Sequence, residues 1–385
     1  MAGTVFSIAL IALGGVFALF LLGLLVGLLR KEGARCQDRP TVSVVVAARN
    51  EERQIGRCAA ALLAQDYPRH RLQIVIVDDR SDDATAAIVE RMAAGQEHLE
   101  LVRLSSCPSN WSPKKHAIAA GVARCRGEVI LCTDADCVPP PGWVSGMVSY
   151  FTPGVGLVAG FSPGSWGPRS RLLLRLMEMD DLALACVAAG SIGIGVPLTC
   201  SGANLAYRKE VYEEVGGFSG VEHLLSGDDD LFLHKVRATS WRCRYARDAA
   251  TIVPSGGPES FRQFRHQRTR HASKGFFYPA WLTTLLILIY LFHCGLMAAV
   301  PMALLGVIAP RVVALAFATA FVPEFLLVGY GAALFRRKRL CPYVPLAALL
   351  YIPYVVVFAV WGTFGKFAWK GAVAHRGYRV NEVEA

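Results

Sequence analysis

Three clusters of aspartate have the residue types and positions to bind a charged ligand. Asp78 and Asp79 end one short apolar run, and Asp134 and Asp136 end another. A third cluster, residues 228–230, starts a helical pattern. Neighbouring carboxylates repel one another unless a positive group lies between them, and a divalent cation that holds a diphosphate meets this need. Each cluster alone is compatible with a solvated turn or a helix cap, but three in this order favour a site for metal and phosphate.

Two basic segments are candidates to bind the phosphates of such a ligand. Lys114 lies at the expected start of a helix, where a lysine can contact a phosphate, with a solvated surface lysine as the alternative. The stretch 262–274 carries Arg262, Arg265 and Arg268 at helical spacing and includes the segment 267–271. This pattern predicts a helix whose arginines contact lipid headgroups, a cationic cover over a diphosphate leaving group, or both.

The scaffold for these side chains has the pattern of an α/β domain over residues 40–278. Four short apolar runs predict buried strands at residues 41–47, 72–77, 99–102 and 129–132. Helical patterns follow the first two runs. Strands that alternate with helices predict a doubly wound parallel sheet, in which ligands bind at the carboxyl ends of the strands. The first two aspartate clusters would then lie at one edge of the sheet.

The composition excludes a simple soluble enzyme. Of 385 residues, 54% are hydrophobic and 18% are charged, whereas soluble proteins have about 45–50% and about 25%. Residues 5–29 carry no charge and are long enough to cross a bilayer. Arg30, Lys31 and Arg35 follow, so the positive-inside rule places the subsequent chain in the cytoplasm. We therefore expect residues 1–30 to form an uncleaved transmembrane anchor.

Residues 279–367 predict further transmembrane helices. Segments 281–308 and 312–335 are long enough to span, and the basic run after residue 335 marks a cytoplasmic end. A full crossing by segment 342–365 would put the basic tail, residues 368–385, outside, whereas its prolines allow a broken or re-entrant segment. The residues after 260 hold 14 Lys and Arg against 3 Asp and Glu. Because this charge flanks apolar segments, it indicates a lipid bilayer as the partner and not a nucleic acid.

Taken in order, the motifs resemble those of the membrane-bound family 2 glycosyltransferases, which have a GT-A (Rossmann-like) nucleotide-sugar domain. The resemblance covers roughly residues 40–275. The segments that carry it are 47–51 (P-x-x-N-E in the family), 78–85 (D-D-x-S-x-D-x-T), 113–118 (G-K-x-x-A-L), 134–136 (D-x-D), 216–218 (G-G-F), 227–231 (E-D-x-D-L) and 267–271 (Q-x-x-R-W). The order of anchor, catalytic domain and C-terminal helices is also similar to that of ceramide glucosyltransferases and hopanoid-associated glycosyltransferases.

The resemblance implies a role for each matched residue. The residues expected to bind the nucleotide sugar are Ala48, Asn50, Glu51, Asp78, Asp79, Lys114 and Asp134. Those expected to hold a divalent cation, Mg²⁺ or Mn²⁺, are Asp134 and Asp136. Those on the diphosphate or acceptor side are Gln267, Arg268, Arg270 and His271. The general base is one of Asp228, Asp229 and Asp230, and alignment on Leu231 selects Asp228.

Departures from the family pattern include four residues. Ala47 replaces a proline, Pro113 a glycine, Gly227 a glutamate and His271 a tryptophan. The glutamate position bears on the choice of the base, so Asp229 and Asp230 stay open as alternatives to Asp228. The tryptophan lies at the acceptor end in processive polysaccharide synthases, and its absence argues against chain extension.

The implied activity is inverting transfer of a sugar from a nucleoside-diphosphate donor, with UDP as the expected nucleotide, to a membrane lipid. The protein would be an integral, multi-pass membrane enzyme with its catalytic domain in the cytoplasm. Three alternatives fit the motifs: a processive polysaccharide synthase, a phosphohydrolase that uses the D-x-D of residues 131–138, and a membrane partner without catalytic activity. The motifs select neither the sugar, the acceptor lipid nor the oligomeric state.

Overall fold

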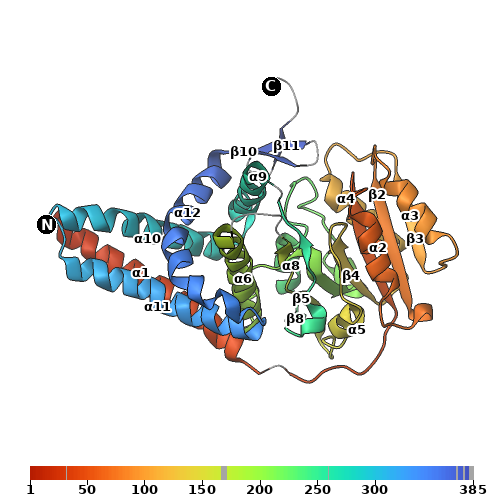
Figure 1. The fold of residues 1–385 in the computed structure, drawn as a ribbon, viewed down its shortest axis with the longest axis horizontal. Helices are drawn as coiled ribbons and strands as arrows, with labels where there is room; N and C mark the ends of the chain where they lie inside the picture. The colour runs from red at the N-terminus through yellow and green to blue at the C-terminus, as the bar shows by residue number, and fades with distance from the viewer. Residues whose placement is uncertain (32, 166–170, 259, 370–371, 376–377, 381–385) are drawn as a thin grey trace.

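The chain folds into an α/β sheet domain at one end and long helices at the other (Figure 1). The computed structural model describes residues 1–31, 33–165, 171–258, 260–369, 372–375 and 378–380. Helices α6 (Arg171–Gly193) and α9 (Phe261–Ala272) lie between the two parts. This arrangement places the boundary between the α/β domain and the long helices beside the edge of the sheet where a ligand site is expected.

Seven strands form the main sheet, in the order β3-β2-β1-β4-β7-β5-β8. The predicted strands are present and pair in parallel: β1 (Val42–Ala48), β2 (Leu72–Asp79), β3 (Leu99–Leu104) and β4 (Val129–Asp134). The whole sheet is mixed, because β7 (Leu205–Arg208), which the sequence did not predict, runs antiparallel to β4 and to β5 (Val155–Gly160). β7 starts at the carboxyl end of β4, so the chain runs back along the sheet from there. The last strand, β8 (Arg242–Ala246), is parallel to β5.

The alternating side chains of β1 divide the interior into two cores. Val44 and Val46 belong to one buried cluster and Val45 to the other, as expected when successive side chains of a strand point to opposite faces. Helix α4 approaches the second face closely, since a Cβ added at Gly121 would lie 2.6 Å from the Val45 side chain. The helices around the sheet are α2 (Ile55–Leu63), α3 (Thr85–Ala93), α4 (Pro113–Arg124), α5 (Trp143–Val148), α7 (Lys209–Glu214) and α8 (Asp230–Arg237).

Four helical segments of the described chain are long and apolar enough to cross a membrane. They are α1 (Ala2–Leu29), α10 (Ala280–Leu304), α11 (Pro310–Leu334) and Lys338–Phe364, which contains α12 (Val344–Phe364). The first three run side by side away from the sheet (Figure 1). They coincide with the apolar segments that the sequence predicts.

Helix α12 takes a different direction and crosses α10 and α11 near α6 and α9 (Figure 1). At its start, Arg339 donates a hydrogen bond of 3.0 Å to Glu178 of α6. At its end, Gly362 packs directly against Ala272 of α9. Both ends of α12 are therefore near the α/β domain, although the helix is continuous. The predicted basic tail begins in the following strands, β10 (Lys366–Trp369), β11 (Ala372–His375) and β12 (Tyr378–Val380), and it lies beside the α/β domain.

The N-terminal helix is packed into the α/β domain instead of being joined only by a linker. Gly27 of α1 lies against the backbone of Gly190 and Gly193 in α6. Arg247 donates hydrogen bonds to the carbonyls of Leu28 at 2.9 Å and Gly27 at 3.1 Å. The last carbonyls of a helix have no partners within the helix, so the guanidinium satisfies them. These contacts fix the orientation of the domain relative to the long helices.

Candidate active site

A cavity of about 680 Å³ opens at the carboxyl ends of β1, β2 and β4. Helices α6 and α9 and the segment before α8 form its other walls. Of the fifteen site residues that the sequence predicts, all but Asn50 and Asp78 line this cavity. Segments far apart in the chain thus meet at the edge of the sheet where ligands of such folds bind.

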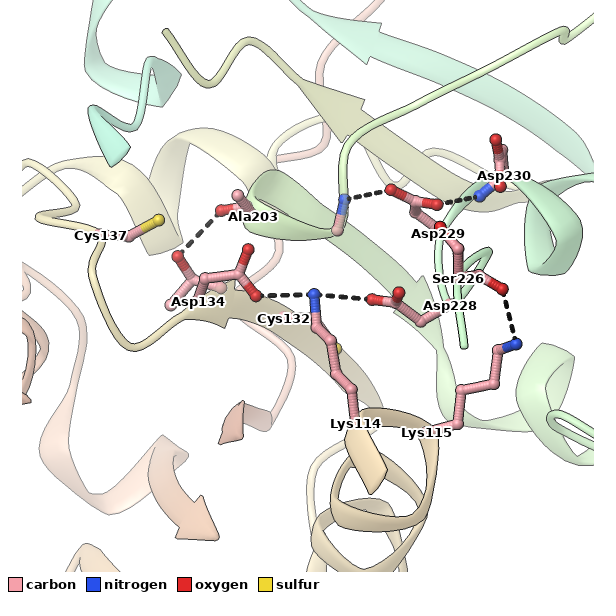
Figure 2. Close-up of polar contacts among 12 residues, drawn as sticks. Lys114, Lys115, Cys132, Asp134, Cys137, Ala203, Ser226, Asp228, Asp229 and Asp230 are labelled. Carbon is pink, nitrogen blue, oxygen red and sulfur yellow. Dashed lines mark hydrogen bonds and ion pairs between the residues drawn. The ribbon is translucent and has the colours of Figure 1, made fainter. Parts of the chain in front are cut away.

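One lysine forms ion pairs with two aspartates at the centre of the site (Figure 2). The Nζ atom of Lys114, in the first turn of α4, lies 2.8 Å from Oδ1 of Asp134 and 2.8 Å from Oδ2 of Asp228. Burial alone would lower the pKa of Lys114, but the two carboxylates outweigh it and raise this pKa above its usual value. The ammonium group therefore stays charged and joins the end of β4 to the loop that carries the third aspartate cluster.

Asp229 and Asp230 are held by backbone groups and by a second lysine. Asp229 accepts hydrogen bonds from the backbone N–H of Asp230 at 2.7 Å and of Gly202 at 3.2 Å. The Nζ atom of Lys274 lies 2.7 Å from Asp230 Oδ2 and 3.4 Å from Asp229 Oδ1, and the Tyr278 hydroxyl donates to Asp230 at 2.5 Å. Burial raises the pKa of Asp230 to about 6 against the opposing effect of Lys274. Both carboxylates thus belong to a supporting network.

Asp228 is the aspartate of this cluster with an uncommitted oxygen. Asp229 uses both carboxylate oxygens for backbone N–H groups, and Asp230 is only 1% exposed. Asp228 engages Lys114 through Oδ2, while its Oδ1 makes no hydrogen bond to the described residues and the side chain lines the cavity. Of the three aspartates, Asp228 therefore keeps the most hydrogen-bonding capacity toward the cavity.

Lys115 fixes the loop from which Asp228 extends. Its side chain is 1% exposed, and its Nζ atom donates to the carbonyls of Val221 and Leu224, each at 2.7 Å. It also donates to the carbonyl of Ser226 at 2.8 Å (Figure 2). These three acceptors use all three donors of the ammonium group. Burial lowers the pKa of Lys115 to about 8. Residues 221–226 are therefore held against α4 beside the ion pair of Lys114.

The loops after β1 and β2 interlock at the opposite end of the cavity. Asn50 has a φ of 54°, a left-handed conformation that asparagine tolerates, and its Oδ1 accepts from the backbone N–H of Asp82 at 2.9 Å. It supports the loop instead of lining the cavity. Asp79 lines the cavity and is held by Arg80 at 2.8 Å, whereas Asp78 is buried outside the lining. Asp78 and Asp79 are equivalent candidates in the sequence, but in the fold only Asp79 lines the cavity.

Asp134 and Asp136 have the chemistry of ligands for a hard divalent cation. Both line the cavity, and carboxylate oxygens are the ligands that Mg²⁺ and Mn²⁺ prefer. The described residues contain no group of three or more His, Cys, Asp or Glu side chains placed to hold a metal by themselves. Two carboxylates at an open cavity fit a cation whose other ligands come from a donor diphosphate and water.

The four predicted residues of α9 line the cavity, but they differ in what they contact. Arg268 is 6% exposed; its guanidinium contacts Asp180 of α6 and lies 3.5 Å from Oδ1 of Asp181. These two aspartates neutralise it, so Arg268 connects α9 to α6 instead of presenting an unpaired charge to a diphosphate. Among the predicted residues of α9, Arg270 is therefore the arginine to which the predicted cationic cover over a diphosphate is assigned.

Four residues of this site were not predicted from the sequence: Lys115, Asp181, Lys274 and Tyr278. Lys274 ends the basic stretch, and Asp181 is one of two neighbouring aspartates in an amphipathic helical pattern. Such an acidic pair beside apolar residues is a usable signal, because burying a charge is costly without a partner. Lys115 and Tyr278 had no comparable signal, since their partners are set by tertiary contacts.

The fold and the cavity define a class of protein. A mixed sheet with a D-x-D segment at the end of a central strand, and a carboxylate before a helix across the cavity, is the GT-A fold of nucleotide-sugar glycosyltransferases. Residues 40–273 match the family described as "Glycosyltransferase like family 2". The chain belongs to this family.

Known proteins with related sequences are also glycosyltransferases. The chain is 28% identical over 244 residues to "Probable glycosyltransferase YdaM" of Bacillus subtilis, a match that covers 61% of this chain and 55% of the relative. It is 35% identical over 112 residues to the beta-monoglucosyldiacylglycerol synthase of Synechocystis sp., which covers 29% of this chain and 23% of that enzyme. The chain thus spans about half the length of the Bacillus protein and less of the Synechocystis enzyme.

A solved structure shares the fold. The mannosyltransferase PcManGT from Pyrobaculum calidifontis, in complex with GDP-Man and Mn²⁺, superimposes with a TM-score of 0.56 at 22% identity. The match covers 93% of this chain and 98% of that chain. At this identity the likeness establishes the fold.

Proposed function

We propose that this glycosyltransferase moves a sugar, with inversion at the anomeric carbon, from a nucleoside-diphosphate sugar to a hydroxyl of a membrane lipid. The observation that carries this proposal is the cavity, in which Asp228, Lys114 and the D-x-D aspartates lie beside α6 and α9. The apolar helices next to these walls and the similarity to a glucosyldiacylglycerol synthase support a lipid acceptor. We also propose that UDP is the nucleotide and that the catalytic domain is cytoplasmic.

In this reaction Asp228 takes the proton of the acceptor hydroxyl. The oxygen of that hydroxyl bonds to the anomeric carbon, and the bond from this carbon to the nucleoside diphosphate breaks. The positive charge of Arg270 stabilises the negative charge that develops on the leaving diphosphate, and Lys114 holds Asp134 and Asp228 in place beside it. Lys115 and Lys274 do not take part in the chemistry. They hold the segment that carries Asp228, so that its carboxylate faces the cavity.

Asp134 and Asp136 would hold the divalent cation. A cation bound there supplies further positive charge for the diphosphate. The Mn²⁺ of the mannosyltransferase complex supports this assignment by analogy of fold. We expect transfer to stop in the presence of a chelator and to return when Mn²⁺ or Mg²⁺ is added in excess.

The test uses the purified full chain in detergent with total lipid, Mn²⁺ or Mg²⁺, and a panel of radiolabelled UDP- and GDP-sugars. Label in the organic phase with a discrete mass shift identifies the sugar and the acceptor together. Asp228→Asn should lower transfer by about 10²- to 10⁴-fold, the usual contribution of a general base, while donor binding is retained. Asp38→Asn, at an exposed aspartate outside the cavity, is the matched control.

Other outcomes contradict specific parts of the proposal. Undiminished transfer by Asp228→Asn would remove the assigned base, and Asp230→Asn would be tested next. Label in an insoluble polymer would indicate a processive synthase. Phosphate release from simple phosphoesters would indicate a phosphohydrolase. Release of nucleotide without labelled lipid would leave the transferase fold in place and refute the lipid acceptor in that mixture.

A further inference from the structure

One face of α6 supplies a stripe of cavity-lining residues at helical spacing. Asp181, Leu184, Ala185 and Ala188 all line the cavity, and positions i, i+3, i+4 and i+7 share one face of a helix. The stripe is a carboxylate followed by three apolar side chains. Leu184 is 42% exposed, so this part of the wall is uncovered by the described chain. A carboxylate next to an apolar surface matches an amphiphilic ligand.

The apolar part of this wall continues toward the long helices. Phe161 and Tyr245 also line the cavity, and their ring centroids lie 5.2 Å and 6.0 Å from that of Phe335, directly after α11. Farther along α6, Gly190 packs against Gly27 near the end of α1. The apolar wall is therefore packed against the ends of two helices of membrane-spanning length.

The charge of the cavity disfavours an anionic acceptor. Eight Asp and Glu side chains and five Lys and Arg side chains are among the described lining residues. Lys114 and Lys274 each contact two of these carboxylates, and Arg268 contacts Asp181 and its neighbour Asp180. A divalent cation and a diphosphate of opposite charge would add little net charge. The excess of carboxylates therefore persists when the acceptor enters.

Asp181 is the carboxylate on the wall where an amphiphile would lie. Its Oδ2 accepts a hydrogen bond from the backbone N–H of Gly164 at 2.9 Å, and its Oδ1 lies 3.5 Å from Arg268. A carboxylate has about four lone-pair positions for hydrogen bonds, so acceptor capacity remains. It can receive hydrogen bonds from hydroxyl groups, whereas it repels a phosphate.

We propose that α6 selects an uncharged acceptor. In this proposal, a hydroxyl-bearing headgroup donates hydrogen bonds to Asp181, its apolar part lies along Leu184, Ala185 and Ala188, and Asp181 excludes lipid phosphates. The inference rests on the proposed function and narrows it from membrane lipids in general to neutral amphiphiles with free hydroxyl groups. Asp181 is a specificity-determining residue in this scheme and takes no part in proton transfer.

The test compares two acceptor probes in phosphatidylcholine vesicles that contain the full chain: diacylglycerol, which is uncharged, and a polyprenyl phosphate. We expect the wild-type protein to prefer the uncharged lipid. Asp181→Asn should reduce this preference by about tenfold, the effect of removing a like charge at ~10 Å in a medium of effective dielectric constant ~20. Asp180→Asn is the matched control, because Asp180 contacts the same Arg268 but does not line the cavity, and it should change the preference less than Asp181→Asn does.

Each result decides the proposal. A wild-type preference for the lipid phosphate, or an equal change of preference in Asp180→Asn and Asp181→Asn, overturns it. If neither lipid accepts sugar while the donor is hydrolysed, the proposed transfer to a lipid is refuted, and the proposed selection of an uncharged ligand is tested on its own. That test measures how strongly two soluble amphiphiles inhibit the hydrolysis of the donor. Stronger inhibition by monooctanoylglycerol than by octyl phosphate would support the uncharged acceptor, and equal or weaker inhibition would refute it. The wild-type comparisons remain decisive if a variant does not fold.

Discussion

Lys274 is the residue whose removal tests the acidic network most directly. Its ammonium lies 2.7 Å from Asp230 and 3.4 Å from Asp229, and the exposed fractions of the Lys274 and Asp230 side chains are 9% and 2%. Lys274→Met would leave the buried Asp230 and the half-buried Asp229 without their main counter-charge. Solvent screening is small at this depth, so we expect destabilisation of about 3–5 kcal/mol, the usual cost of breaking a buried ion pair.

The assay is thermal unfolding of the purified full chain in detergent, followed by tryptophan fluorescence. A loss of this size should lower Tm by roughly 10 °C in a protein of this length. Arg262→Gln, at an exposed arginine of the preceding helix, is the control and should change stability by less than about 0.5 kcal/mol. Transfer activity should fall with Lys274→Met, because the segment that carries Asp228 loses an attachment.

A second variant separates the ion pair from packing effects. Asp230→Asn removes one of the two carboxylates, so the double variant Lys274→Met with Asp230→Asn should be about 1–3 kcal/mol more stable than the sum of the single changes predicts. Strict additivity, or a Tm for Lys274→Met equal to that of the wild type, would refute the account of this lysine as the counter-charge of the buried aspartates.

Two further predictions concern neighbouring parts of the site. Lys115→Met should lower Tm and kcat together, because three buried carbonyls lose their donor at a cost of about 1–3 kcal/mol for each group left unsatisfied; an unchanged Tm would contradict the hydrogen bonds described. Burial raises the pKa of Asp181 to about 6 from an ordinary 3.8, against the effect of Arg268. The stability that protonated Asp181 contributes is therefore full below pH 3.8 and is lost as the pH rises through about 6. Asp181→Asn should remove part of the decrease in Tm between pH 4 and pH 7, and an identical pH dependence in wild type and variant would contradict this prediction.

Much of the fold follows from local sequence patterns. The strands β1, β2 and β4 are short, buried and mostly apolar runs, and the uncharged length of α1 is recognisable without any tertiary information. The antiparallel β7 was not predicted, because the direction of a four-residue strand depends on where the preceding chain enters the sheet. The course of α12 was likewise undetermined, since its composition is the same whether it spans a bilayer or lies across other helices.

The sequence by itself determined which kinds of side chain the site contains: the D-x-D aspartates, the third acidic cluster and a lysine at a helix start lie in recognisable motifs. Tertiary structure decided what each of them contacts. Only the fold shows that Asp79 lines the cavity while Asp78 does not. It also pairs Arg268 with two aspartates of α6 and places Lys274 beside the third acidic cluster. The physical reason is that charge and hydrogen-bonding capacity belong to the residue type, whereas burial and partners depend on elements that meet only when the chain has folded.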